Sequence, residues 1–401
     1  MSKAVPPSAA DGTPTSGDHR DRDPLTRDGS SPRGVLLAAS AFCAILLIAL
    51  LGVLHVPYVA LGPGPVTDVI AAAVPASPSP TADARPSGGT AGGGGLITIS
   101  GTDTYPTDGQ LDLTTVSLRG GPGLEMTLWE ALADWRDPDV SVVPRSLYFR
   151  SGTSQEQADA ESAAEMTGSQ ENAKVAALTE LGITFKATTT RRVQQIGSDA
   201  PAARVLRVGD EITSVNGVEV ADFAALQNAV RALPPGTSVQ LGLERSGKPR
   251  TVTTATYAPQ GTTLLGIVPD VEYAFPFDID IAIDDVGGPS AGTMFALGIV
   301  DELTPGAMTG GRHIAGTGEI AADGTVGPIG GLRQKVIGAR ADGATWFLAP
   351  VEECAQVAGA TPDGITVVGI STLHGARMAV EAIGAGRGAE LTTCDETATV
   401  R

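Results

Sequence analysis

The chain has 401 residues, of which 42% are hydrophobic and 18% are charged. At roughly 100–200 residues per domain this length predicts two or three folded units, and the apolar content excludes a chain that is disordered throughout. The formal net charge of −18 excludes nucleic acid as the main partner, because binding to phosphates requires a basic surface.

The N-terminal part divides into a polar and an apolar segment. Residues 1–33 are rich in Pro, Ser, Gly and Asp and show no apolar periodicity, which predicts a disordered tail. Residues 34–54 contain no charged side chain, and a helix of about 20 such residues is long enough to cross a bilayer. We therefore expect a transmembrane helix here, with a cleaved signal peptide as the alternative.

The charges around the apolar segment predict its orientation. Arg27 and Arg33 precede it, whereas the next Lys or Arg is Arg85. The positive-inside rule then places the N-terminus in the cytoplasm and the remaining domains outside the cell membrane, in a single-pass arrangement. Residues 55–95 end in a run rich in Pro, Ser and Gly, which indicates an extracytoplasmic linker.

The next segment predicts short strands around one short helix, followed by a long helix. Runs at 96–100, 111–118 and 140–144 are rich in β-branched residues, as strands are, and residues 127–135 form an amphipathic helical pattern. Residues 154–181 lack proline and carry apolar residues at helical spacing, namely Met166, Ala173, Ala177 and Leu181.

Residues 183–257 predict a compact unit rich in strands. A Gly-Asp turn at 209–210 and an Asn-Gly turn at 216–217 separate short alternating runs, and a helix follows. Residues 201–233 resemble the core of a PDZ domain, which binds an extended chain end along a sheet edge. The resemblance assigns the loop for the terminal carboxylate to Leu181, Gly182, Ile183 and Thr184, while a purely packing role for the unit stays open.

A glycine-rich turn at 287–292 carries the first candidate catalytic residue. The residues before it alternate as in a strand and those after it have an apolar helical pattern, which places Ser290 at a strand-to-helix junction. Glycines such as Gly288 leave room for a substrate backbone, and N–H groups at a helix start can stabilise an oxyanion. A serine that only caps a helix produces the same pattern, so this motif alone does not assign a function.

A second motif, GTGEIAADGTVGPIGGLRQKVIGA, lies at residues 316–339. It predicts two short strands joined by a tight turn, then a double glycine and a helix that carries Lys335. A lysine has an ordinary pKa of about 10.4 and must be neutral to accept the proton of a serine hydroxyl. Apolar neighbours in sequence, such as Leu332 and Val336, favour burial of the amine and hence a lowered pKa.

Together the two motifs resemble the proteolytic domain of Lon proteases, peptidase family S16. The resemblance implies a serine endopeptidase in which Ser290 is the nucleophile, Lys335 is the general base and Thr317 helps to hold the lysine. This chain has Gly287-Gly288 where that family often has Asp-Gly. It also has Glu353 where the related sequences commonly have asparagine.

Two other functions stay open on the sequence alone. Residues 288–292 also fit the GxSxG nucleophile elbow of esterases, with Asp342 or Asp363 as the acid and His374 as the base, although the sequence has no HGGG-type oxyanion loop. The other alternative is a membrane-tethered adaptor that binds partners through its PDZ domain without cutting them.

The order of the parts resembles the YlbL-like, PDZ-containing, membrane-anchored Lon proteases of Gram-positive bacteria. That resemblance implies an α+β fold, in which a Lon-type proteolytic domain of sheets and helices carries an inserted PDZ domain behind the transmembrane helix. The predicted segments are a cytoplasmic tail (1–33), a transmembrane helix (34–54), a linker (55–95), the first part of the protease region (96–182), the PDZ domain (183–257), the Lon-type proteolytic domain (258–388) and a flexible tail (389–401).

The implied activity requires neither ATP nor another cofactor, since the sequence contains no GxxxxGK[ST] phosphate-binding motif. The expected partners are unfolded, flexible or tail-exposed protein substrates and the membrane, and a homo-oligomer is compatible with the sequence. No metal site is expected, because the three cysteines lack metal-binding spacing. Cys354 and Cys394 form either one disulfide or two free thiols.

Overall fold

The structure, a computed structural model, describes residues 32–70, 96–150, 152–259, 261–283 and 286–399. The chain divides into two compact units, Met1–Leu54 and His55–Arg401. In the first unit, Pro32–Val53 forms helix α1. Within the described ranges, no helix combines the length and the apolar character needed to cross a membrane. The polar tail predicted over residues 1–33 lies almost entirely outside these ranges.

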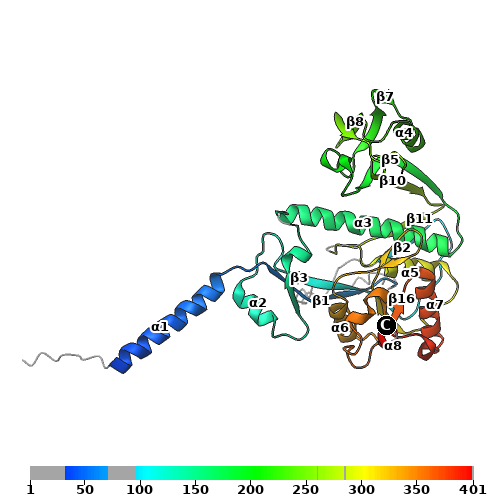
Figure 1. The fold of residues 1–401 in the computed structure, drawn as a ribbon. Helices are drawn as coiled ribbons and strands as arrows, with labels where there is room; N and C mark the ends of the chain where they lie inside the picture. The colour runs from blue at the N-terminus through cyan, green and yellow to red at the C-terminus, as the bar shows by residue number, and fades with distance from the viewer. Residues whose placement is uncertain (1–31, 71–95, 151, 260, 284–285, 400–401) are drawn as a thin grey trace, which may run out of the picture. The chain divides into compact units, whose positions relative to one another are not determined.

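A six-stranded mixed sheet forms the centre of the larger unit, in the order β16-β15-β12-β3-β1-β4 (Figure 1). Strands β3, β12, β15 and β16 run parallel to one another, whereas β1 is antiparallel to both β3 and β4. The strands are β1 Tyr58–Asp68, β3 Gln110–Arg119, β4 Ser141–Pro144, β12 His313–Gly316, β15 Trp346–Pro350 and β16 Thr366–Ile370.

The prediction that residues 55–95 form a linker is wrong for their first part. Tyr58–Asp68 is an internal strand of the sheet, with β3 on one side and β4 on the other. Its prolines and glycines suggested a loop, but they lie at a bulge, where Gly64 passes so close to Thr115 that a Cβ atom would lie 2.4 Å from the Thr115 hydroxyl oxygen. Residues 71–95 lie outside the described part of the chain.

Helices cover both faces of this sheet. Successive strand residues point to opposite faces, so Ile314 and Leu348 join the core that contains α5, while Ala315 and Phe347 join the core that contains α6. The predicted long helix is confirmed as α3, which packs on α5. The helices of this unit are α2 Leu128–Asp134, α3 Gln155–Glu180, α5 Gly292–Leu303, α6 Leu332–Asp342, α7 Leu373–Gly384 and α8 Cys394–Thr399, with short turns η1 Arg145–Leu147, η3 Val351–Gln356 and η4 Gly388–Glu390.

Segments before and after residues 186–274 belong to one folded region. Strand β2, Ile97–Ser100, pairs with β11, Asp278–Ile281, and β3 pairs with β12 across nearly 200 residues of sequence. A further small hairpin joins β13, Glu319–Ile320, to β14, Val326–Gly327. The main fold is therefore interrupted in sequence by a second unit of structure.

That second unit, residues 186–274, is called the small lobe below. Its sheet has the order β10-β5-β6-β8-β9, with β7 paired to β6, and encloses its own hydrophobic core. The sheet extends beyond residue 257, because β10 pairs with β5 along its length. The elements are β5 Lys186–Ile196, η2 Pro201–Arg204, β6 Glu211–Val215, β7 Val218–Glu219, α4 Phe223–Arg231, β8 Ser238–Arg245, β9 Lys248–Ala255 and β10 Ile267–Ala274.

Cys354 and Cys394 form a disulfide, which decides between the two alternatives that the sequence left open. The bond spans 40 residues and ties the turn η3 to the start of α8. Because it restricts the unfolded chain, we expect the Cys354→Ser, Cys394→Ser double variant to lose about 3–4 kcal/mol of unfolding free energy. Denaturant unfolding of the oxidised protein and the variant measures the loss, and coincident transitions would contradict it.

Candidate active site

Ser290 lies in the turn that leads into α5, two residues before the helix begins at Gly292. The turn depends on Gly288, whose φ of 84° lies in the left-handed region that side chains with a Cβ disfavour. The structure thus places the predicted nucleophile at a helix N-terminus, where backbone N–H groups are not yet used by the helix.

Helix α3 supports this turn from one side. The N–H of Gly288 donates to the Ser162 carbonyl over 3.1 Å, and the Ser169 hydroxyl donates to the Pro289 carbonyl over 2.9 Å. A Cβ atom on Gly287 would lie 2.0 Å from the Ser162 hydroxyl oxygen, so a larger residue there would displace the Ser162 side chain. The long helix predicted from sequence therefore serves to hold the serine turn.

Lys335 and Thr317 converge on Ser290. The Lys335 Nζ atom lies 2.7 Å from Ser290 Oγ and 2.9 Å from Thr317 Oγ1, and Lys335 is only 2% exposed. Thr317 follows strand β12, and its hydroxyl donates to the Ser290 carbonyl over 3.0 Å. The three residues that the two motifs singled out are thus in direct contact.

The buried position changes the acidity of the lysine. Burial disfavours the charged ammonium and lowers the pKa of Lys335 to about 7, while the negative charge of Glu353 acts in the opposite direction. A lysine with this pKa is neutral in a large fraction of molecules near neutral pH. It can therefore accept a proton, which an ordinary surface lysine at that pH cannot.

The double glycine before α6 allows the N-terminus of this helix, which carries Lys335, to pack closely against the sheet. Gly331 caps the helix with a φ of 70°, and a Cβ atom there would lie 2.7 Å from the Val116 side chain on β3. Lys335 lies in the first turn of α6, since its N–H donates to the Gly331 carbonyl over 3.1 Å. The helix start is thus pressed directly against the sheet.

Sequence reasoning missed one buried acidic residue near the lysine. Glu353 in η3 is 7% exposed, and its carboxylate accepts hydrogen bonds from the Ile329 N–H at 2.8 Å and from the Gln356 amide at 2.9 Å. Burial raises the pKa of Glu353. The only sequence signal at this position was its departure from the pattern of the family that the chain resembles.

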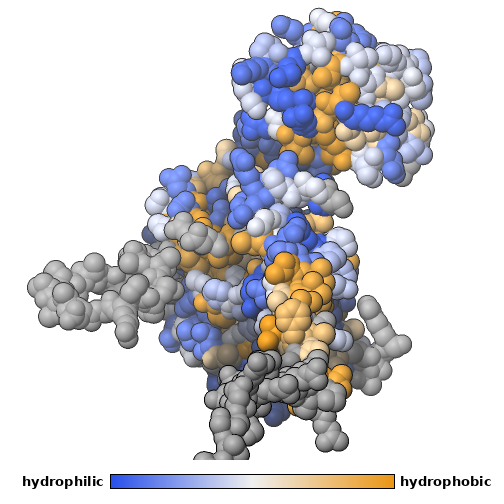
Figure 2. Space-filling view, turned by 90° about the vertical axis from the view of Figure 1, so that its left-hand side faces the viewer, coloured by the Kyte–Doolittle hydropathy of each residue, from blue (hydrophilic) through white to orange (hydrophobic). Residues whose placement is uncertain are grey.

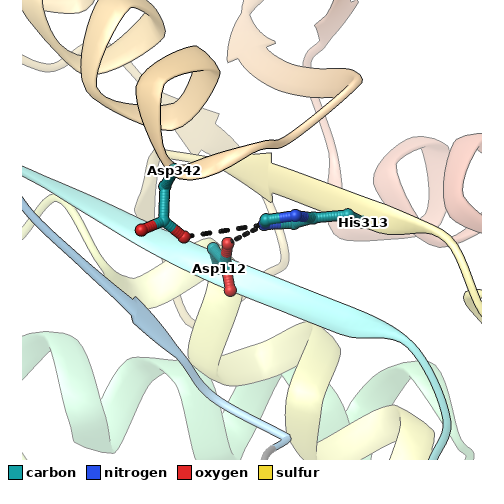
Figure 3. A group of neighbouring side chains, drawn as sticks. All are labelled: Asp112, His313 and Asp342. Carbon is teal, nitrogen blue, oxygen red and sulfur yellow. Dashed lines mark hydrogen bonds and ion pairs between the residues drawn. The ribbon is translucent and has the colours of Figure 1, made fainter.

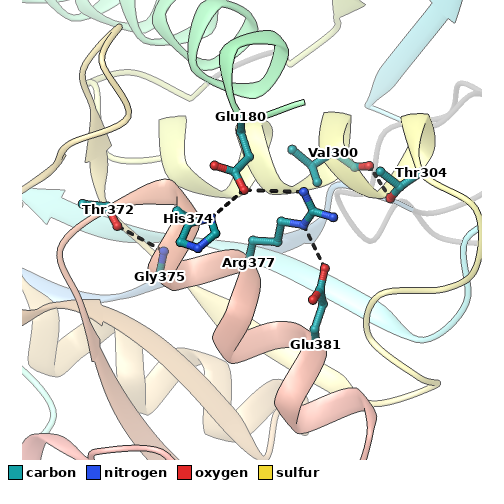
Figure 4. Close-up of polar contacts among 8 residues, drawn as sticks. All are labelled: Glu180, Val300, Thr304, Thr372, His374, Gly375, Arg377 and Glu381. Atoms are coloured by element: carbon teal, nitrogen blue, oxygen red, sulfur yellow. Dashed lines mark hydrogen bonds and ion pairs between the residues drawn. The ribbon is translucent and has the colours of Figure 1, made fainter. Parts of the chain in front are cut away.

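The histidine required by the esterase alternative makes other contacts. The Nδ1 atom of His374 lies 2.9 Å from the Glu180 carboxylate, which Arg377 also contacts at 3.5 Å (Figure 4). These contacts join α7 to the end of α3, and the His374 side chain is 70% exposed. Among the described residues, the side-chain partner of the Ser290 hydroxyl is the Lys335 amine.

Asp112, His313 and Asp342 form a second polar cluster (Figure 3). Their possible metal-ligand atoms all lie within 4.8 Å of one another. His313 Nε2 is hydrogen-bonded to the buried Asp112 carboxylate and lies 3.9 Å from Asp342. The hydrogen bond to His313 provides a partner for the buried Asp112 carboxylate and joins β3 to β12.

The residues predicted to bind a terminal carboxylate are engaged elsewhere, and this prediction is corrected. Gly182 has a φ of 67° and ends helix α3, where the N–H groups at positions 181–183 donate to carbonyls of its last turn. The side chains of Leu181 and Ile183 pack on the core that contains α5. A glycine between two apolar residues is common at helix ends, which explains the false match for Leu181, Gly182, Ile183 and Thr184.

The small lobe offers a different edge for an added strand. β10 lies at the edge of its sheet and follows Leu264-Leu265-Gly266, where Gly266 has a φ of 77° and Leu265 is buried in the lobe's core. The opposite edge, β9, begins Lys-Pro-Arg, a composition that discourages pairing. Figure 2 shows hydrophobic side chains gathered in a strip on this lobe between hydrophilic ones.

Two segments of the chain match known domain families. Residues 179–256 match the PDZ domain, and residues 281–372 match the Lon protease (S16) C-terminal proteolytic domain. The chain therefore combines a PDZ domain with a Lon-type proteolytic domain in a mixed α/β structure.

Individual relatives resemble parts of the chain. Lon protease 1 of Bacillus subtilis is 40% identical over 96 residues, which is 23% of this chain and 12% of that protein. The periplasmic serine endoprotease DegP of Salmonella typhimurium is 43% identical over 61 residues, 15% of this chain and 13% of that protein. The crystal structure of the PDZ domain of the SdrC-like protein from Listeria monocytogenes is 25% identical, covering 20% of this chain and 84% of that chain with a TM-score of 0.19. The chain thus spans only a small part of the curated relatives it matches.

Proposed function

We propose that this protein is an ATP-independent serine endopeptidase with a Ser290–Lys335 dyad, anchored in the cell membrane and acting on extracytoplasmic or membrane-associated proteins. The observation that carries the proposal is the 2.7 Å contact between the Lys335 amine and the Ser290 hydroxyl in a buried site. The matches to Lon proteases support serine protease chemistry.

The geometry supports a two-stage acyl transfer. Neutral Lys335 accepts the Ser290 proton as Oγ attacks the substrate carbonyl, and the resulting ammonium then donates the proton to the leaving amine. In the second stage Lys335 accepts a proton from water as the water oxygen attacks the acyl carbonyl; the bond to Ser290 Oγ then breaks, and the ammonium returns the proton to Oγ. The backbone N–H groups of Ser290 and Ala291 precede the first turn of α5, where they can donate to the developing oxyanion.

A cavity beside the serine turn provides room for substrate. Its volume is about 720 Å³, and it lies between α3 on one side and residues 281–283 with Val286 and Gly287 on the other. Met166, Ile281 and Val286 contribute apolar side chains to its lining. We propose that an extended substrate chain occupies this cavity and places an apolar side chain there.

The direct test compares the wild type with Ser290→Ala on a casein-like unfolded protein without ATP. Loss of the nucleophile is expected to abolish cleavage, while the control variant His374→Ala retains it. Undiminished cleavage by Ser290→Ala would overturn the dyad. Loss of cleavage in His374→Ala would instead favour an esterase-like triad, and binding of protein without cleavage by the wild type would favour an adaptor.

Thr317 is expected to hold the lysine without taking part in bond making. Thr317→Val keeps the shape of the side chain but removes the hydroxyl that contacts both Lys335 and Ser290. We expect kcat to fall about 10–100-fold with little change in KM, because the amine loses its alignment. Steady-state kinetics measure this, with Thr317→Ser as the variant that should recover most of the activity. An equal kcat in Thr317→Val and the wild type would contradict the proposal that Thr317 holds the lysine.

We further propose that the PDZ domain selects substrates by their C-terminal ends, which add as a strand beside β10. The support is the edge position of β10 after the Leu264–Gly266 turn. A peptide with an apolar C-terminal residue and a free carboxylate should bind at least about tenfold more tightly than its C-terminal amide, measured by fluorescence anisotropy. Equal affinities would show that the lobe does not recognise chain ends.

The proposal of membrane anchoring rests on the uncharged sequence of residues 34–54. Cell fractionation with carbonate extraction tests the anchoring. Recovery of the full chain in the extracted soluble fraction would overturn that part of the proposal and leave the dyad unaffected.

A further inference from the structure

The buried carboxylate of Glu353 contacts the segment that leads into the catalytic helix. Its Oε2 atom accepts the Ile329 N–H over 2.8 Å, two residues before the cap of α6 at Gly331. The same carboxylate is held by the Gln356 amide at 2.9 Å. Glu353 therefore fixes the backbone from which Lys335 extends.

Other residues pack against the loop that contains Ile329, Gly330 and Gly331. A Cβ atom on Gly330 would lie 3.2 Å from the Tyr148 hydroxyl, and one on Gly331 would lie 2.7 Å from Val116. The loop is thus pressed between β3, the end of η1 and η3. Loss of the Glu353 hydrogen bond would remove a polar contact that packing against the other sides does not replace.

Three titratable groups surround the Glu353 carboxylate. Against the larger effect of burial, which raises the pKa of Glu353, the charge of Lys335 in α6 lowers it, and the charge of Glu352 on the same turn raises it. The charge of Glu353 in turn raises the pKa of Tyr148, which follows η1. Conversely, the charge of Glu353 raises the pKa of Lys335 against the effect of burial. Each group thereby favours the charged form of the other.

We propose that Glu353 is a positioning residue of the dyad: through its hydrogen bond to the Ile329 N–H its carboxylate aligns the loop that leads to Lys335, and its negative charge makes the enzyme less tolerant of acid than burial of the lysine alone would. This inference rests on the proposed Ser–Lys peptidase function. It adds a residue that lies outside both sequence motifs, residues 287–292 and residues 316–339.

The first test is Glu353→Gln, with Glu352→Gln as a matched control that removes an exposed carboxylate next to it. Glutamine can still accept the Ile329 N–H, and Gln356 can rotate its amide to accept in turn. The acid limb of kcat/KM should move to lower pH, giving about threefold higher activity at pH 6 relative to each enzyme's plateau. An acid limb that stays in place, or that moves equally in the control, would overturn the inference.

The second test separates alignment from charge. Glu353→Ala removes both, so kcat on the plateau should fall about tenfold with KM little changed, while the acid limb moves as in the glutamine variant. We expect Glu353→Gln to have a plateau kcat close to that of the wild type, but an acid limb at the same lowered pH as in Glu353→Ala. A lower unfolding midpoint with an unchanged pH profile would show a merely structural role.

A readout that does not need peptidase activity distinguishes the two proposals. With ¹³C-labelled lysine, the NMR signal of the Lys335 side chain should titrate at lower pH in Glu353→Gln than in the wild type. An unchanged titration contradicts the coupling even in an active enzyme. If the Lys335 titration moves in Glu353→Gln but the wild type cleaves no substrate, the peptidase proposal is contradicted. The electrostatic coupling between Glu353 and Lys335 is then still supported.

Discussion

Lys335→Met is expected to lower kcat/KM on an unfolded protein substrate about 10³–10⁴-fold, because methionine fills the same space but cannot accept the serine proton. The same change is expected to raise the free energy of unfolding by about 1–2 kcal/mol, since it removes a buried amine. An inactive but more stable enzyme is the distinctive outcome, which misfolding cannot produce.

The sign of the stability change follows from proton binding. The pKa of the lysine is about 10.5 in the unfolded chain and about 7 in the folded one. Between these values the unfolded state binds more protons, so stability rises with pH over that window, and below about 7 the full cost of the buried amine is present. Methionine removes that cost at neutral and acidic pH.

Chemical denaturation and initial rates on the same preparations measure both effects. Lys335→Arg is the charge-keeping comparison, which should be inactive and less stable, because arginine does not lose its proton. Activity within tenfold of the wild type in Lys335→Met would contradict the base assignment. A fall in stability would contradict the description of the amine as a buried, poorly solvated group.

The activity of the wild type is expected to fall about tenfold per pH unit below pH 7 and to be nearly level above it. The lysine must be neutral to act as the base, and its pKa is about 7 in the folded protein, so acid converts the base into an inactive ammonium. At pH 5 kcat/KM should be roughly a hundredth of its plateau value.

A fluorogenic peptide assay over this range measures the profile. Unfolding midpoints at each pH are the necessary control, because burial also raises the pKa of Asp301 to about 6 and that of Glu302 to about 7. A profile that stays level down to pH 5 in a folded enzyme would contradict a lysine base. The residual kcat/KM of Lys335→Met should show no decrease with acid near pH 7, because the titrating amine is absent.

The motifs around Ser290 and Lys335 could be found from sequence because their signals are local. Glycines, turn residues and helical periodicity occur within a few positions of each of these two residues. Local signals of the same kind, alternation for the strands and helical spacing for α3, predicted other elements of the fold. The contact itself joins residues 45 positions apart, and only the folded chain shows the 2.7 Å approach.

The predictions from sequence that were wrong concern segments whose local pattern is compatible with two different local structures. Leu181–Thr184 has the pattern of a carboxylate loop and of a helix end, and the packing of its apolar side chains on the α5 core decides for the helix end. Tyr58–Asp68 resembles a loop in composition, but its hydrogen-bonding partners β3 and β4 make it a strand. The partners lie far away in sequence, so no local pattern contains them.

By itself, the sequence determined the residue types of the site, the turns that present them and the succession of a PDZ domain and a Lon-type domain. Only the tertiary structure decided which cysteines are joined, that Tyr58–Asp68 is a strand of the sheet and that Glu353 lies buried beside the loop that leads to Lys335. It also decided the acidity of Lys335. The physical reason is that burial and charge interactions depend on groups brought together from distant segments, whereas turns and helices are encoded by neighbours in the chain.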